Sequence, residues 1–139
     1  MKFLKVVLLI FAFFATQGAY SQSYEDGRAA HKNKDYQGAF KIYRALADKG
    51  DARSQNDLGV MYQLGNGVPV SEKLAFAWYQ KSADKGFLGG QFNLALMYLN
   101  GRGVEANAEH AVTWMRKAAE QNHAPAQYMI GLMYSDGVG

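Results

Sequence analysis

The segment Leu58-Gly-Val-Met-Tyr-Gln-Leu-Gly-Asn-Gly-Val68 decides the fold, because two further copies of it follow in the chain. They are Leu94-Ala-Leu-Met-Tyr-Leu-Asn-Gly-Arg-Gly-Val104 and Ile130-Gly-Leu-Met-Tyr-Ser-Asp-Gly137, each starting 36 residues after the copy before it. The stretch behind the first copy also returns at this offset, with Ala75-Phe-Ala-Trp-Tyr-Gln-Lys-Ser-Ala83 matching Ala111-Val-Thr-Trp-Met-Arg-Lys-Ala-Ala119. A fixed period of this length indicates a repeat array, in which each unit buries its apolar face against its neighbours.

Each full unit is predicted to be a pair of helices. In the unit 51–86, Asp51 caps a first helix that ends at Gly65-Asn-Gly67-Val-Pro69, and Ser71 opens a second helix. Helical spacing places one apolar stripe on each second helix. The predicted stripes are Ala75, Trp78, Tyr79, Ser82 and Ala83 in this unit, and Ala111, Trp114, Met115, Ala118 and Ala119 behind the cap Asn107 in the unit 87–122. Gly59, Ala95 and Gly131 are predicted to let the two helices of a pair approach closely.

The two ends of the array depart from the full pattern. Residues 22–50 are interpreted as a degenerate first helix pair, capped by Ser23 and Asp35. The second of these helices carries Ala39, Ile42, Tyr43, Leu46 and Ala47 on one face. Residues 123–139 are interpreted as an incomplete unit that holds a first helix without its second. We therefore expect Ile130, Met133 and Tyr134 to lack a covering helix.

Residues 1–21 have the pattern of a secretory signal peptide. Lys2 and Lys5 precede an apolar run from Val6 to Ala15, and Ala19-Tyr-Ser21 is a small-x-small cleavage site. Cleavage is predicted after Ser21, with Ala19 as the alternative. Because a membrane-spanning helix needs about 20 apolar residues, the run is too short to span comfortably. The predicted location is therefore periplasmic or secreted, with no membrane span after cleavage.

Composition excludes several kinds of chemistry. The chain has no cysteine, which rules out disulfides, thiolate catalysis and cysteine-bound zinc. Without Lys2 and Lys5 the formal charge falls from +3 to +1 and no basic run remains, so nucleic-acid binding is not expected. The three histidines are not at metal-ligand spacing, and we predict no metal, cofactor or catalytic residue.

The Gly65-x-Gly67 and Gly101-x-Gly103 pairs lack the preceding strand and third glycine of a dinucleotide-binding loop, so they are interpreted as turns between helices.

The residues that differ from unit to unit indicate where a partner could bind. They lie on the first helix of each pair and point away from the face that holds Leu58 and Tyr62. In chain order they are Arg53, Asn56, Val60, Gln63 and Leu64, then Phe92, Leu96, Leu99 and Asn100, then Tyr128, Leu132 and Ser135. An apolar stripe with a polar rim is typical of a site for an amphipathic helix or an extended peptide. Packing between neighbouring first helices is the alternative for each of these residues.

The recurring landmarks resemble those of Sel1-like repeats, which are related to tetratricopeptide repeats. The motif residues are Ala124-Pro-Ala-Gln-Tyr-Met-Ile-Gly-Leu-Met-Tyr-Ser-Asp-Gly137 and Gly65-x-Gly-Val68 followed by Ala75-x-x-Trp78-x-x-Lys81-x-Ala83. The resemblance implies an all-α fold, an α-solenoid in which antiparallel helix pairs form a right-handed superhelix with the site residues on its concave face. It also implies an adaptor that binds proteins or peptides and is not an enzyme. The alternative is a hydrolase acting on cell-wall or β-lactam substrates, although that type of exported Sel1-like protein is rich in cysteine.

Overall fold

The computed structural model describes residues 21–138, so the predicted signal peptide lies outside the described residues except for Ser21. Seven α-helices make up the described part, and it contains no strand. They are α2 (Tyr24–Lys32), α3 (Tyr36–Asp48), α4 (Ala52–Leu64), α5 (Glu72–Asp84), α6 (Leu88–Asn100), α7 (Ala108–Glu120) and α8 (Ala124–Ser135). Within residues 21–138, no helix has both the length and the apolar character needed to cross a membrane.

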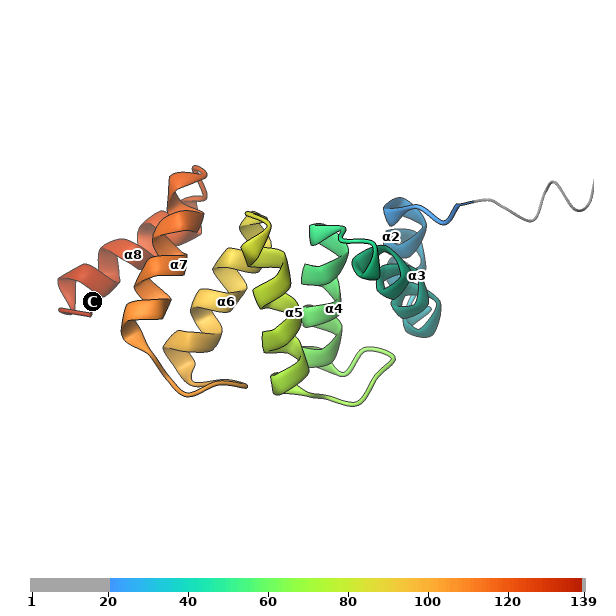
Figure 1. Cartoon of the computed structure of the whole chain (residues 1–139), viewed down its shortest axis with the longest axis horizontal. Coiled ribbons are helices and arrows are strands. Elements are labelled where there is room, and N and C mark those ends of the chain that lie inside the picture. The colour runs from blue at the N-terminus through green and yellow to red at the C-terminus, as the bar shows by residue number, and fades with distance from the viewer. Residues whose placement is uncertain (1–20, 139) are drawn as a thin grey trace, which may run out of the picture.

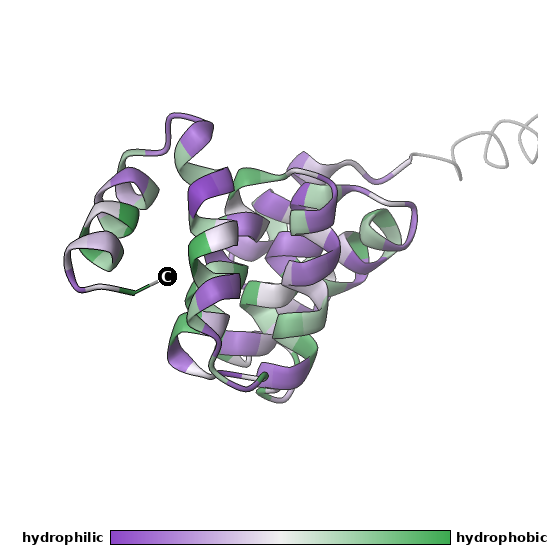
Figure 2. Cartoon of the chain, turned by 60° about the vertical axis from the view of Figure 1, so that its left-hand side comes forward, coloured by the Kyte–Doolittle hydropathy of each residue, from purple (hydrophilic) through white to green (hydrophobic). Residues whose placement is uncertain are grey.

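The helix pairs follow one another along the long axis of the molecule, with α2 and α3 together at one end and α8 at the other (Figure 1). Each helix packs mainly on the helix before it and the helix after it, and α4 also packs on α6. Apolar and polar segments alternate along the helices, as expected when one face of each is buried (Figure 2). The predicted all-α solenoid of stacked helix pairs is therefore confirmed.

The helix starts follow the predicted capping residues. Ser23 and Asp26 form a reciprocal capping box at the start of α2. Side-chain oxygens of four other caps accept a hydrogen bond from the backbone N–H three residues on; these caps are Asp35, Asp51, Ser71 and Asn107. Such a bond satisfies one of the free N–H groups of the first helical turn. The residues next to each start therefore determine where these helices begin.

The core runs through the array as connected clusters and contains the predicted stripe of α5. Ala75, Trp78, Tyr79, Ser82 and Ala83 are all buried. The corresponding stripe of α7 is only partly buried, since Ala111, Met115 and Ala118 are buried whereas Trp114 and Ala119 are half-buried.

The difference between the two tryptophans has a physical cause. Arg44 and Lys81 both lie over the Trp78 ring, 5.2 and 4.2 Å from its centroid. Only Lys117 lies over the Trp114 ring in the described chain, at 4.2 Å. One period after Arg44 the sequence has Gln80, a shorter and uncharged side chain. Trp114 therefore has one cationic side chain fewer over its ring than Trp78, and it is the more exposed of the two.

The glycine pairs are turns between helices, as predicted. Gly101 and Gly103 have left-handed backbones, with φ of 64° and 69°. A Cβ built on Gly103 would lie 2.6 Å from the carbonyl carbon of Glu72 and nearer still to its oxygen. Gly67 approaches the backbone of Tyr36 in the same way one unit earlier. The second glycine of each pair thus lets the turn lie against the start of the preceding unit's second helix.

The predicted close approach of paired helices occurs at Gly59 and not at Gly131. A Cβ on Gly59 would lie 2.5 Å from the Tyr79 ring, whereas a Cβ on Gly131 would meet no described atom within 4 Å. The reason is that no helix follows α8 among residues 21–138.

The expectation that three residues of α8 lack cover is wrong for Met133, which is 4% exposed. Its register, shared with Met61 and Met97, directs it toward the preceding helix pair, where it joins a cluster with Met115. Ile130 is half-buried and Tyr134 is 50% exposed, because these two positions face the side on which a second helix would pack.

Candidate functional site

The first helices of the units, α2, α4, α6 and α8, carry all the predicted binding residues. We use the name A-helix surface for the side chains of these helices that the helical register places away from the face holding Leu58 and Tyr62. Its predicted members are Arg53, Asn56, Val60, Gln63, Phe92, Leu96, Leu99, Asn100, Tyr128 and Leu132. Arg53, Asn100, Tyr128 and Leu132 are exposed and the other six are half-buried, so the surface is only partly open to solvent.

The part of the A-helix surface on α4 is polar except for Val60, and several of its polar groups already have partners. The Arg53 guanidinium lies 4.3 Å from the centroid of the Tyr24 ring. Asn56 Oδ1 accepts a hydrogen bond of 2.9 Å from the Asn93 amide on α6. Gln63 Oε1 accepts one of 2.7 Å from the Tyr79 hydroxyl. These contacts tie α4 to its neighbours, so Asn56 and Gln63 also have a structural role.

The part of the surface on α6 and α8 is apolar except for Asn100. Phe92, Leu96 and Leu99 pack against the cluster that joins α6, α7 and α8, which explains their partial burial. Tyr128 and Leu132 on α8 are 68% and 40% exposed. They occupy the same repeat positions as Phe92 and Leu96, one period later. The apolar stripe therefore becomes more exposed as it passes from α6 to α8.

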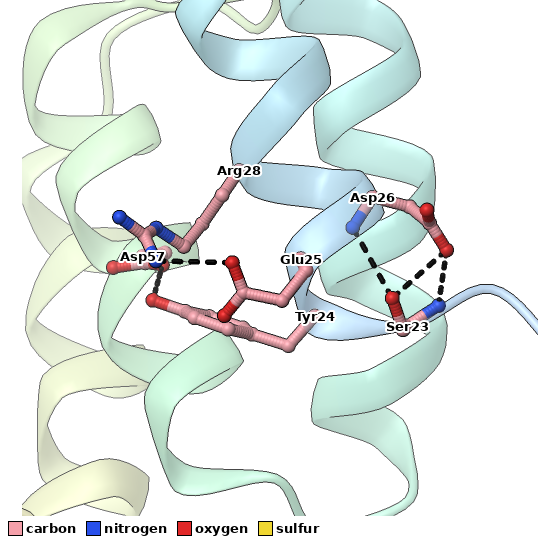
Figure 3. Close-up of polar contacts among 6 residues, drawn as sticks. All are labelled: Ser23, Tyr24, Glu25, Asp26, Arg28 and Asp57. Carbon is pink, nitrogen blue, oxygen red and sulfur yellow. Dashed lines mark hydrogen bonds and ion pairs between the residues drawn. The ribbon is translucent and has the colours of Figure 1, made fainter.

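A pocket of about 680 Å³ lies at the other end of the surface, between α2, α3 and α4. Tyr24 lines it from α2, Tyr43 from α3, and Asp57 and Val60 from α4. The Tyr24 hydroxyl donates a hydrogen bond of 2.8 Å to Asp57 Oδ2 (Figure 3). Tyr24 and Val60 occupy equivalent repeat positions, so the pocket continues the line of the A-helix surface.

The pocket holds a carboxylate without an ion-pair partner. Arg28 lines the pocket, but its guanidinium pairs with Glu25 at 3.0 Å (Figure 3). No Lys, Arg or His nitrogen among residues 21–138 forms a salt bridge with Asp57, whose other oxygen accepts a longer bond of 3.3 Å from the Asn56 amide. Burial raises the pKa of the Asp57 carboxyl, because removal from water penalises the charged form.

Burial and the nearby Asp57 charge also act on the two phenols of the pocket. They raise the pKa of Tyr43 to about 12, and they raise the pKa of Tyr24 as well. Both hydroxyls are therefore neutral near pH 7, and Tyr24 serves as the donor in its bond to Asp57.

The sequence analysis missed Tyr24, Asp57 and Asn93 as members of this surface. The repeat offset was the signal for two of them, since Tyr24 precedes Val60 by one period and Asn93 follows Asp57 by one period. No sequence pattern shows that Tyr24 and Asp57 meet, because their bond joins residues 33 positions apart.

The histidines have packing contacts in the array. His31, His110 and His123 form aromatic contacts with Tyr36, Tyr98 and Phe92, at centroid distances of 5.2, 4.9 and 5.0 Å. Within the described chain, no group of three or more His, Cys, Asp or Glu residues could hold a metal ion.

Comparison with protein families gives one match that covers most of the chain. The Sel1 repeat model matches residues 17–51, 52–87, 89–123 and 124–139. No curated protein sequence matches the chain.

Several solved structures are similar to this one. A Sel1 repeat protein from Oxalobacter formigenes is 38% identical with a TM-score of 0.80, and the match covers 84% of this chain and 48% of that one. A protective antigen of uropathogenic Escherichia coli that has an SLR fold is 35% identical with a TM-score of 0.78, over 84% of this chain and 26% of that one. Helicobacter pylori cysteine rich protein B shares the fold alone, at 22% identity and a TM-score of 0.65 over 67% and 70%. The chain thus spans about half, or less, of the length of the first two.

Proposed function

Because the chain belongs to the Sel1 repeat family, we propose that it is an exported scaffold that binds a protein or peptide along the A-helix surface, the concave face of the solenoid. Sel1 repeat proteins are generally protein–protein interaction scaffolds, and the fold of this chain is theirs. In such a protein the stacked helices form a rigid frame, and the side chains that vary between units select the partner.

The exposed apolar side chains on α8 carry this proposal. Tyr128 and Leu132 extend the half-buried stripe of Phe92 and Leu96 into solvent. Apolar residues gathered on one face are typical of binding surfaces, and tyrosines are frequent among the residues that contribute most binding energy. Arg53 and Asn100, both exposed, supply a polar rim that favours partners with matching hydrogen-bond groups.

Export is the second part of the proposal and is supported by the leader pattern of residues 1–21. A positive start, an apolar run and a small-x-small site are the three parts of a secretory signal peptide. The partner is then expected in the periplasm or outside the cell. Expression of the full-length gene in a Gram-negative bacterium should yield a periplasmic or secreted protein that begins at Gln22, or at Tyr20 if cleavage follows Ala19.

Capture of partners from a cell-envelope extract tests the binding site. Leu132→Asp should weaken the partner's binding by about 2 kcal/mol or more, roughly thirtyfold, because it places a charge in an apolar contact. Leu74→Asp is the matched control, since Leu74 is similarly exposed, at 45% against 40% for Leu132, and lies on α5 outside the A-helix surface.

The readout is the set of proteins that mass spectrometry finds with wild type, Leu132→Asp and Leu74→Asp, each shown to be folded by circular dichroism. A partner retained by wild type and Leu74→Asp and lost by Leu132→Asp supports the proposal. A partner lost only by Leu74→Asp would place the site on the second helices and contradict it.

A further inference from the structure

We propose that the pocket between α2, α3 and α4 binds a lysine or arginine side chain of the partner peptide, with Asp57 as its counter-charge. The inference rests on the proposed function, because it assigns a chemical preference to one end of the same surface. It adds a binding pocket that prefers a positively charged residue of the partner.

The first support is the charge balance of the pocket. Glu25 and Arg28 neutralise each other at 3.0 Å, so of the two carboxylates that line the pocket only Asp57 has no ion pair within residues 21–138. Asp57 is half-buried, so its charge lacks part of its hydration. A buried charge is stabilised by an opposite charge that also forms hydrogen bonds, and an ammonium or guanidinium group supplies both.

The second support is the shape and lining of the pocket. A volume of about 680 Å³ is ample for a lysine or arginine side chain. The phenol rings of Tyr24 and Tyr43, with centroids 5.7 Å apart, and the Val60 side chain offer apolar contact to the aliphatic stem of such a residue. Tyr24 holds one carboxylate oxygen of Asp57 at 2.8 Å, which fixes the acceptor before a ligand arrives.

An acidic ligand is the competing possibility, because Arg28, His31 and Lys32 also line the pocket. The His31 ring packs against Tyr36, at a centroid distance of 5.2 Å. Arg28 is already paired, and Lys32 is an exposed residue at the end of α2. An incoming carboxylate would have to break the Arg28 pair and approach Asp57, which repels it. The described charges therefore favour a cation.

The position of the pocket predicts the spacing of residues in the partner. The pocket lies at the α2–α4 end of the A-helix surface, and the exposed apolar side chains Tyr128 and Leu132 lie on α8. Packed helices lie 8–10 Å apart, and α6 and α8 are not among the helix pairs in close contact, so two helix spacings along the surface are at least on the order of 20 Å. An extended chain needs about six residues or more to cover this distance. The partner should carry a basic residue about six or more positions from its bulky apolar residues.

A displayed library of random dodecapeptides, presented to the immobilised full chain, tests the inference. Wild type should enrich peptides that combine Lys or Arg with bulky apolar residues at about this spacing. Asp57→Asn keeps the size of the side chain and removes its charge, and it should lower the enrichment of Lys and Arg at least about tenfold while apolar enrichment remains. Arg28→Gln is the control for an acidic ligand and should leave the basic preference in place.

A second measurement does not depend on a variant of the protein. A peptide selected by wild type is synthesised with its basic residue replaced by norleucine for Lys or citrulline for Arg. Fluorescence anisotropy should show at least about tenfold weaker binding to the wild-type chain.

The possible outcomes separate this inference from the proposed function. Apolar enrichment without a basic preference, or a basic preference unchanged in Asp57→Asn, would overturn the pocket assignment and leave the scaffold proposal standing. Enrichment of acidic residues that Arg28→Gln abolishes would also overturn it. A wild-type chain that enriches no peptide would count against both proposals.

Discussion

Replacing Trp78 with alanine should lower the free energy of unfolding by about 3–5 kcal/mol, the cost of deleting a large aromatic side chain from a core. Trp78 is 6% exposed and joins the cluster that contains Tyr43, Leu58 and Met61. This cluster holds α3 against α4 and α5, so the substitution leaves a cavity where the first unit meets the second. In a repeat array the contacts between neighbouring units supply much of the stability, so their loss should also destabilise the units next to the substituted one.

Urea unfolding followed by far-ultraviolet circular dichroism measures this effect without depending on the deleted fluorophore. Trp114→Ala is the matched control. It should lower the free energy of unfolding less than Trp78→Ala does, because Trp114 is half-buried and Lys117 is the one cation over its ring within residues 21–138. Equal stability of Trp78→Ala and wild type would mean that Trp78 is not a core residue and that the register of α5 is wrong.

Replacing Gly103 with alanine should lower the free energy of unfolding by roughly 2–5 kcal/mol, the second largest effect among the substitutions considered. The φ of Gly103 is 69°, a left-handed conformation that costs an L residue about 1–2 kcal/mol. The added Cβ would also lie 2.6 Å from the carbonyl carbon of Glu72, and relief of such overpacking typically costs about 1–3 kcal/mol. The displaced turn also carries Arg102, which pairs with Glu72 at 2.7 Å.

Gly86→Ala separates the two contributions. Gly86 has a similar φ of 80°, but a Cβ there would meet no described atom within 4 Å. It should therefore show only the conformational cost of about 1–2 kcal/mol, and thermal or urea unfolding of both variants measures the difference. Equal costs for Gly103→Ala and Gly86→Ala would contradict the close approach of the turn to α5.

Much of the fold could be predicted because its determinants are local or periodic. Five caps each bond within three residues of themselves, and the left-handed Asn122, with φ of 62°, stands one period after Gly86. The repeat offset placed the buried stripe of α5 correctly. It failed for Met133, because the repeat offset does not show which face of α8 packs on α7.

The candidate surface was less predictable, because its character depends on contacts between units. Helical register placed Asn56 and Gln63 on the A-helix surface, but their hydrogen bonds reach Asn93 and Tyr79, 37 and 16 residues away. The pocket depends on the bond from Tyr24 to Asp57 in the least regular part of the array. Such pairings follow from the superhelical geometry, which a repeat period alone does not specify.

Amide hydrogen exchange of the wild-type chain, with and without a captured partner or a selected peptide, tests the central claim most directly. A ligand on the A-helix surface should slow exchange in α4, α6 and α8, with α2 included if the pocket is occupied, and should leave the solvent-facing parts of α3, α5 and α7 unchanged. Slowed exchange confined to α3, α5 and α7 would place the ligand on the opposite face and contradict the account.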